Sequence, residues 1–348
     1  MCSRILGTRE LSVKHTGENI RIAVRDVLEE FGAWRPGNTY VTDNAANMKL
    51  AMKEKSWLDN LNLVLAHALR DNRDPDQSED YMSEVLQQIS VCKGIVAHVK
   101  RSRIQAKLDT TLKQAVSTRW NSILTMLQSV LCNTDNLKKL ADEFADRTLQ
   151  RSLLDVNVEL LKQVVALLQH FDAATRLLST DLTPSLHLVY PTKVQLSKKL
   201  QPQDGDGLIV NELKSRLMSR LEASFHIQPL HCLATLLDPR MKTGILSAQE
   251  KLDAVTALRA LLAEVEDTDA DSASCEPAAK KRKLDCDFFA DLFATTTSVV
   301  DEVDEYLNCT DSAADVLSFW QGKEETWPKL TQCAKWILST PATSTSSE

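Results

Sequence analysis

A long block of the chain, from about residue 80 to residue 262, repeats its apolar residues with the period of an α-helix. Apolar residues three or four positions apart lie on one face of a helix, so each run can bury a stripe against its neighbours. These positions include Val85, Leu86, Ile89, Cys92, Val96 and Val99, then Trp120, Ile123, Leu124, Leu127 and Leu131, then the leucine-rich stretch 153–168. We therefore predict a large all-helical domain, and the block shows no fixed-period repeat of the kind that builds a solenoid.

The N-terminal segment has a different pattern, in which short extended runs flank one helical run. Residues 5–13 fit a strand, and apolar residues at helical spacing then occupy 20–31. Thr39 to Thr42 are β-branched or aromatic, which favours a second strand that Asp43 ends. A carboxylate at the C-terminal end of a strand lies where open α/β sheets build their sites, although a cap on the following helix also accounts for Asp43.

Five segments, taken in order, carry a resemblance to a known family. They are residues 15–20 (His-Thr-Gly-Glu-Asn-Ile), 38–48 (Asn-Thr-Tyr-Val-Thr-Asp-Asn-Ala-Ala-Asn-Met), 117–122 (Ser-Thr-Arg-Trp-Asn-Ser), 233–242 (Leu-Ala-Thr-Leu-Leu-Asp-Pro-Arg-Met-Lys) and 337–348 (Ile-Leu-Ser-Thr-Pro-Ala-Thr-Ser-Thr-Ser-Ser-Glu). Together they resemble hAT-family transposases and the BED zinc-finger proteins domesticated from them. The resemblance extends over nearly the whole chain.

This resemblance implies an α/β plus all-α fold, in which a partial RNase H-like core is interrupted by a large helical insertion domain. We expect the partial core in residues 1–70 and the helical insertion in residues 71–263. Residues 264–287 are expected to be a disordered linker. Residues 288–348 are expected to be a helical segment that returns to a truncated form of the family's C-terminal dimerisation region. The chain is thus expected to be truncated at both ends and to lack the BED finger.

The resemblance also bears on catalysis. Transposases of this family are expected to hold two divalent metals with three carboxylates, because in-line displacement at phosphorus needs both the attacking and the leaving oxygen stabilised. Asp43 matches the second carboxylate, and Glu348 matches the Glu of the family's Ser-Glu-Arg-x-Phe-Ser segment. The first carboxylate, expected in an Asp-x-Trp segment before His15, has no counterpart in this sequence. We therefore expect both residues to be vestigial, with no metal, no other cofactor and no enzyme activity.

Residues 264–287 pass from an acidic stretch through a small polar one to a basic one. Low hydrophobicity and blocks of like charge predict disorder. The basic stretch contains four successive cations, Lys280, Lys281, Arg282 and Lys283. A flexible cationic segment can lie extended in an acidic groove, and this one resembles a monopartite nuclear import signal, with a solvated charge run as the alternative. We expect importin as a partner and the nucleus as the location.

A second basic cluster lies near the predicted end of a helix, and its members are Lys100, Arg101, Arg103 and Lys107. These side chains could contact phosphates. Cations at a helix C-terminus are also favoured by the helix dipole, so a plain solvated face remains the alternative.

Three further expectations concern packing. We expect Trp120 to anchor the core and Asp238-Pro-Arg to form a turn with a local ion pair. Trp320, Trp327 and Trp336 are expected to expose apolar surface, because their packing partners would lie in segments that this chain lacks. Such surface predicts association or poor solubility.

Composition limits the remaining classes. The eight cysteines form no Cys-x-x-Cys pair, which argues against a zinc site or a disulfide framework. The net charge of −7 argues against a surface that coats nucleic acid, so any DNA contact is expected to be local and weak. No apolar run reaches the length of a membrane span, and we expect a soluble intracellular protein with no membrane partner.

These patterns predict a catalytically inactive, hAT transposase-derived nuclear protein. Its expected role is protein association, with itself or with a related transposase-like chain, linked to DNA or to transcription regulation. Two alternatives remain open. One is a metal-dependent transposase or nuclease fragment whose first carboxylate comes from a partner chain. The other is a decayed element without a selected function.

Overall fold

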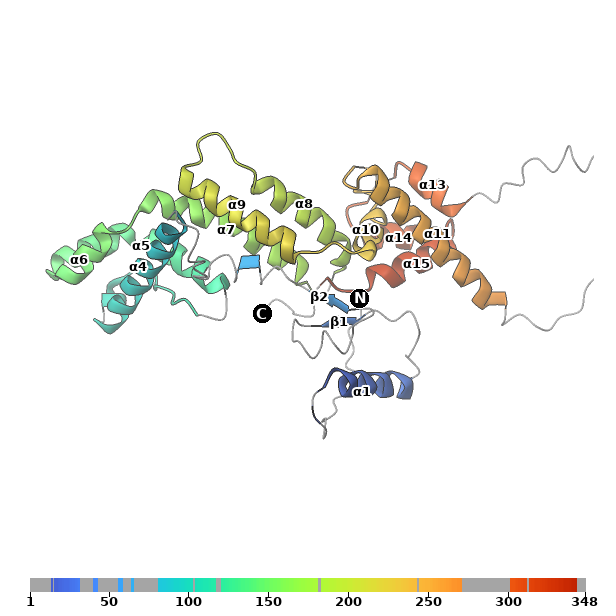
Figure 1. Ribbon diagram of the computed structural model, residues 1–348, viewed down its shortest axis with the longest axis horizontal. Helices are drawn as coiled ribbons and strands as arrows, with labels where there is room; N and C mark the ends of the chain where they lie inside the picture. The colour runs from blue at the N-terminus through green and yellow to red at the C-terminus, as the bar shows by residue number, and fades with distance from the viewer. Residues whose placement is uncertain are drawn as a thin grey trace, which may run out of the picture. The chain divides into compact units, whose positions relative to one another are not determined.

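The computed structural model describes residues 14, 16–31, 40–42, 56–58, 64–65, 81–102, 104–116, 120–180, 183–242, 244–270, 301–311 and 313–342. This part of the chain is mostly helical and divides into two compact units (Figure 1). We call residues 182–191 and 227–342 the C-terminal unit, and residues 3–181 and 192–226 the N-terminal unit. Residues 1–2 and 343–348, which fall to the C-terminal and N-terminal unit respectively, lie outside the described part.

The start of the N-terminal unit contains one helix and a pair of strands. Helix α1 is Gly17–Glu30, and the side chain of Thr16 caps it by accepting a hydrogen bond from the Asn19 backbone N–H. Strands β1 (Tyr40–Thr42) and β2 (Ser56–Leu58) pair in parallel, with Val41 opposite Trp57. The predicted helix over 20–31 and the predicted strand at Thr39 to Thr42 are therefore confirmed. The predicted strand over 5–13 lies outside the described residues, and an RNase H-like core stays a prediction.

Helices fill the rest of the chain that the structure describes. The N-terminal unit contains α4 (Tyr81–Arg101), the short 3-10 helix η1 (Ile104–Lys107), α5 (Trp120–Glu143), α6 (Arg147–Leu154), α7 (Val158–Leu178), most of α8 (Val189–Lys199) and α9 (Leu208–Ser224). The C-terminal unit contains the 3-10 helix η2 (Leu186–Leu188), α10 (Pro229–Leu236), α11 (Ala248–Ala270), α13 (Glu302–Asn308), α14 (Val316–Gly322) and α15 (Pro328–Leu338). The helical period between residues 80 and 262 is thus confirmed.

Helix α4 organises the N-terminal unit, because it packs against α5, α6 and α9, while α5 packs against α6 and α7. Gln88, which is buried on α4, donates from its side chain to the Asp155 carbonyl (3.0 Å) and accepts from the Asn157 N–H (2.9 Å). Its side chain therefore provides hydrogen-bond partners for the backbone of the turn between α6 and α7. Trp120 begins α5 as a buried side chain, which confirms its role as a core anchor. Arg119 lies outside the described residues.

The C-terminal unit is built around α10 and α11. Helix α10 packs against α11, η2 and α15, and α11 also contacts α13 and α15, while α14 packs on α15 (Figure 1). Helix α11 continues to Ala270, so its last turns overlap the acidic stretch that charge and hydrophobicity predicted to be disordered. A run of acidic residues does not exclude helix, because Glu and Ala have high helix propensity. The remainder of that predicted linker, residues 271–287, lies outside the described residues.

The tryptophans of the C-terminal unit correct one expectation. Trp320 is 1% exposed and Trp327 is 4% exposed, so the prediction that both would present apolar surface is wrong. They pack with Tyr306 and Phe319 in an aromatic cluster whose ring centroids lie between 5.0 and 6.5 Å apart. Their packing partners therefore come from within the unit. Trp336 is 47% exposed, as expected.

Among the described residues, no helix is both long enough and apolar enough to cross a membrane.

Candidate functional site

Most of the site residues predicted from sequence lie outside the described part of the chain. This applies to Asp43 and Glu348, to Arg103, and to the four cations 280–283. Their predicted roles are therefore untested.

The described members of the second basic cluster are exposed at the end of α4 and in η1. Lys100 donates to the side-chain oxygen of Gln114 (3.3 Å), and the Arg101 Nε donates to the Ala97 carbonyl in the last turn of its own helix (3.3 Å). Lys107 Nζ lies 3.3 Å from a Glu143 carboxylate oxygen and 4.3 Å from the centroid of the Phe144 ring. These contacts suit a solvated helix end, and they leave the cations open to phosphates as well.

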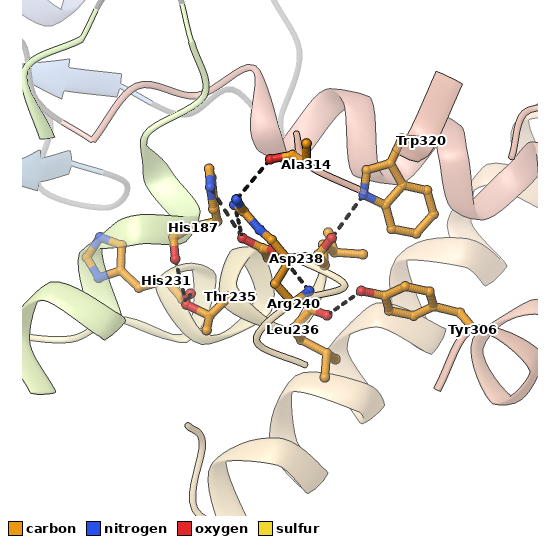
Figure 2. Close-up of polar contacts among 10 residues, drawn as sticks. His187, His231, Thr235, Leu236, Asp238, Arg240, Tyr306, Ala314 and Trp320 are labelled. Atoms are coloured by element: carbon orange, nitrogen blue, oxygen red, sulfur yellow. Dashed lines mark hydrogen bonds and ion pairs between the residues drawn. The ribbon is translucent and has the colours of Figure 1, made fainter. Parts of the chain in front are cut away.

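A connected set of polar contacts lies instead inside the C-terminal unit, centred on the fully buried Asp238 (Figure 2). Arg240 donates to its two carboxylate oxygens from Nε (2.9 Å) and Nη2 (2.7 Å) and donates a third hydrogen bond from its backbone N–H (3.0 Å). The Arg240 Nη1 reaches the Ala314 carbonyl at 3.3 Å. The predicted turn with a local ion pair is therefore confirmed, and the pair also ties this turn to the segment before α14.

Two buried histidines belong to the same set of contacts, and one of them, His187, lies beside this ion pair (Figure 2). His187 on η2 has its Nε2 3.5 Å from an Asp238 oxygen, and its Nδ1 has no hydrogen-bond partner in the described part of the chain. His231 on α10 accepts a hydrogen bond at Nδ1 from the Gln228 N–H (3.1 Å). Thr235 joins the two helices by donating toward the carbonyls of His187 (3.1 Å) and His231 (2.8 Å). The contacts of Thr235 hold η2 against α10.

The end of α10 is closed by aromatic donors from two other helices. The Tyr306 hydroxyl of α13 donates to the Leu236 carbonyl (2.8 Å), and the Trp320 indole of α14 donates to the Leu237 carbonyl (2.9 Å). The last carbonyls of a helix have no partner within the helix, and leaving them buried without one is costly. These two side chains therefore give the last carbonyls of α10 hydrogen-bond partners (Figure 2), and both rings also belong to the aromatic cluster.

The ends of α13 and α15 are closed in the same way. The buried Lys242 donates to the carbonyls of Tyr306 (2.6 Å) and Cys309, at the C-terminal end of α13. At the start of α15, the Leu330 N–H donates to the Glu302 carboxylate at 2.7 Å, and the Trp327 indole donates to that of Glu305 at 2.6 Å. A cation at a helix C-terminus and carboxylates at a helix N-terminus both match the helix dipole. Burial nevertheless lowers the pKa of Lys242.

Sequence reasoning missed His187, Lys242 and Glu302 as positions that hold this unit together. The signal for Lys242 was its place directly after an apolar helix and a tight turn, where a long cationic side chain can reach the end of another helix. The signal for Glu302 was weaker, because an acidic residue in a first turn usually serves its own helix. No sequence pattern pointed to His187.

The first prediction concerns the buried ion pair. We expect Asp238→Asn to lower the free energy of unfolding of the C-terminal unit by about 2 to 3 kcal/mol, because it removes the counter-charge of Arg240 while that guanidinium stays partly buried. Urea titration followed by tryptophan emission measures the change. As a matched control, Asp172→Asn breaks an exposed ion pair with Arg176 on α7, and we expect a loss below about 1 kcal/mol. Equal losses in the two variants would contradict a structural role for Asp238.

The second prediction concerns pH. Burial lowers the pKa of His231 from 6.5 to about 3 and also lowers the pKa of His187. Each folded pKa lies below the unfolded one, so the unfolded state takes up protons first as the pH falls. The stabilisation is therefore complete above about pH 6.5 and is lost as the pH falls from there toward about 3. Through His231 alone, we expect about 2 kcal/mol less stability at pH 5 than at pH 7, measured by urea titration.

The control for this pH effect is His231→Asn. The amide oxygen can accept the same hydrogen bond from the Gln228 N–H but does not titrate, so the variant should lose less stability between pH 7 and pH 5 than the wild type. An unchanged pH dependence would show that His231 is not the group responsible.

One family model and several known proteins are similar to this chain. Residues 294–348, which include α13, α14 and α15, match the hAT family C-terminal dimerisation region. Zinc finger protein 618 from mouse is 26% identical over 348 residues, which is 98% of this chain and 36% of that protein. The Hobo transposase of Drosophila melanogaster is 29% identical over 223 residues, which is 64% of this chain and 33% of the transposase. Human zinc finger BED domain-containing protein 4 is 26% identical over 393 residues, covering 100% of this chain and 31% of the relative.

The chain thus spans about a third of the length of the curated relatives it matches. The resemblance to hAT transposases and BED-type zinc-finger proteins is confirmed: this chain is similar to the Hobo transposase and to both zinc finger proteins, and its residues 294–348 match the hAT family C-terminal dimerisation region.

Proposed function

We propose that the chain is a catalytically inactive, hAT-derived nuclear protein whose C-terminal unit mediates self-association. The observation that carries this proposal is the match of residues 294–348 to a dimerisation region. The helices in that match do not stand alone, because α13 and α15 pack against α11, and α15 also packs against α10 and α14. A region that forms part of a well-packed unit can present one fixed surface to a partner.

The proposal of inactivity rests on the carboxylates. The resemblance to transposases requires three, and this sequence supplies counterparts of two, Asp43 and Glu348. Two carboxylates do not complete a clamp for two divalent metals, so we propose that these 348 residues by themselves hold no metal and no other cofactor. The partial RNase H-like core and the helical insertion domain belong to the same proposal, with the parallel strand pair and the helices α4 to α9 as their described parts.

Nuclear location and DNA contact complete the proposal. Residues 280–283 would serve as the import signal and bind importin as an extended cationic segment. Lys100, Arg101, Arg103 and Lys107 would give weak, local contact with DNA phosphates, and we propose a role in transcription regulation through protein association. With a net charge of −7, specific and tight DNA binding is not expected of this chain.

The third prediction tests self-association directly. Light scattering coupled to gel filtration should show a discrete dimer whose share rises with protein concentration, with little change when a DNA duplex is added at physiological salt. A monomer at every concentration would contradict the proposal. So would a polydisperse aggregate, because it indicates apolar contact without a defined interface.

The similarity to the Hobo transposase favours one alternative, a metal-dependent transposase or nuclease fragment completed by a partner chain. The fourth prediction separates the two functions. We expect the purified chain to produce no nicking of DNA with Mg²⁺ or Mn²⁺, with or without a related transposase chain. Metal-dependent nicking that disappears in Asp43→Asn would establish the alternative, since the amide removes the charge that a metal ligand needs.

A further inference from the structure

We propose that the exposed strip of α15 centred on Trp336 is the middle of a twofold interface with a second copy of this chain. The inference rests on the proposed self-association and goes beyond it by naming the surface and its geometry. The strip consists of Lys329, Gln332, Trp336 and Ser339, all of which are exposed. Their spacing of three or four residues places them on one face of the helix.

The opposite face of α15 is buried inside the C-terminal unit. Its buried side chains are Leu330, Thr331, Cys333, Ala334, Ile337 and Leu338. The helix is therefore held in place by its inner face, and its strip is presented on a rigid support. A rigid support lowers the entropy that association costs.

Trp336 differs from the other two tryptophans of this region. The indole N–H groups of Trp320 and Trp327 donate to Leu237 and Glu305, and both rings are buried. Trp336 leaves 47% of its surface exposed, and no hydrogen bond of its indole occurs among the described residues. Tryptophan is one of the residue types that most often dominate protein interfaces, because it combines a large apolar ring with one donor. It is the large apolar side chain exposed on α15.

A second copy is the occupant that we assign to the strip, because the strip lies in the region that matches a dimerisation model. In an isologous dimer each residue meets a partner across the twofold axis. Antiparallel packing of two copies of α15 places Trp336 of each over Gln332 of the other, and Lys329 of each opposite Ser339 of the other.

Charges near the strip would cause little repulsion between two copies of the chain. Lys335, the neighbour of Trp336, is paired with Glu324 of its own chain. The strip itself contains no carboxylate. Leu252 on α11 is likewise exposed in this unit, but it lies outside the region that matches the dimerisation model. Trp336 is both exposed and inside that region.

The fifth prediction uses Trp336→Glu in the full chain. We expect the dimer dissociation constant to rise at least tenfold, measured by sedimentation at several concentrations, because a central aromatic anchor is replaced by a charge. Leu154→Glu is the matched control: Leu154 is 84% exposed in the N-terminal unit, and its replacement should leave the constant unchanged. Circular dichroism of both variants checks that they remain folded.

A second readout does not depend on the charged variant. The emission of Trp336, obtained as the difference between the wild type and Trp336→Phe, should shift to shorter wavelength as concentration rises, because the ring leaves water. A dimer that forms equally well in Trp336→Glu, with no emission shift, would overturn this interface and leave the proposed self-association standing. A wild-type chain that stays monomeric would overturn both.

Discussion

The C-terminal unit depends on one constraint: its helices are short, and their ends are buried. A helix leaves its first N–H groups and last carbonyls without partners, and burying them unpaired costs free energy. Here the partners come from other helices and from the turn after α10. Tyr306 and Trp320 donate to the last carbonyls of α10, Lys242 in that turn donates to carbonyls at the end of α13, and Glu302 accepts from the first turn of α15. Removing α13 or α14 would leave carbonyls at the end of α10 without a partner, so we expect the unit to fold as a whole.

The turn after α10 connects these contacts. Asp238 holds Arg240 within the turn, Arg240 reaches the segment before α14, and Lys242 at the end of the turn reaches α13. A buried ion pair is weak evidence for net stability, but it fixes one geometry because each partner is costly without the other. These contacts hold α13 and the segment before α14, and α15, which carries the proposed strip, packs against α13 and α14. The buried polar contacts of this turn therefore stabilise the helices that pack against α15, the helix proposed to contact a second copy of the chain.

Local patterns could predict part of this structure and part of the site. The helical block and the strand at β1 followed from periodicity and β-branched residues, and the turn at Asp238 followed from its Asp-Pro-Arg sequence. The burial of Trp320 and Trp327 could not be predicted, because it depends on α10 and α13, which lie far away along the chain. The contacts of Lys242 could not be predicted for the same reason, because the carbonyls to which it donates lie beyond residue 300.

The most direct test of self-association through the C-terminal unit is hydrogen exchange of the full chain at high and low concentration. Slower exchange at high concentration across α15 (Pro328–Leu338), with no change in α5 and α7, is the predicted result. Protection that depends on concentration but is confined to the N-terminal unit, or that is absent throughout, would contradict the central claim.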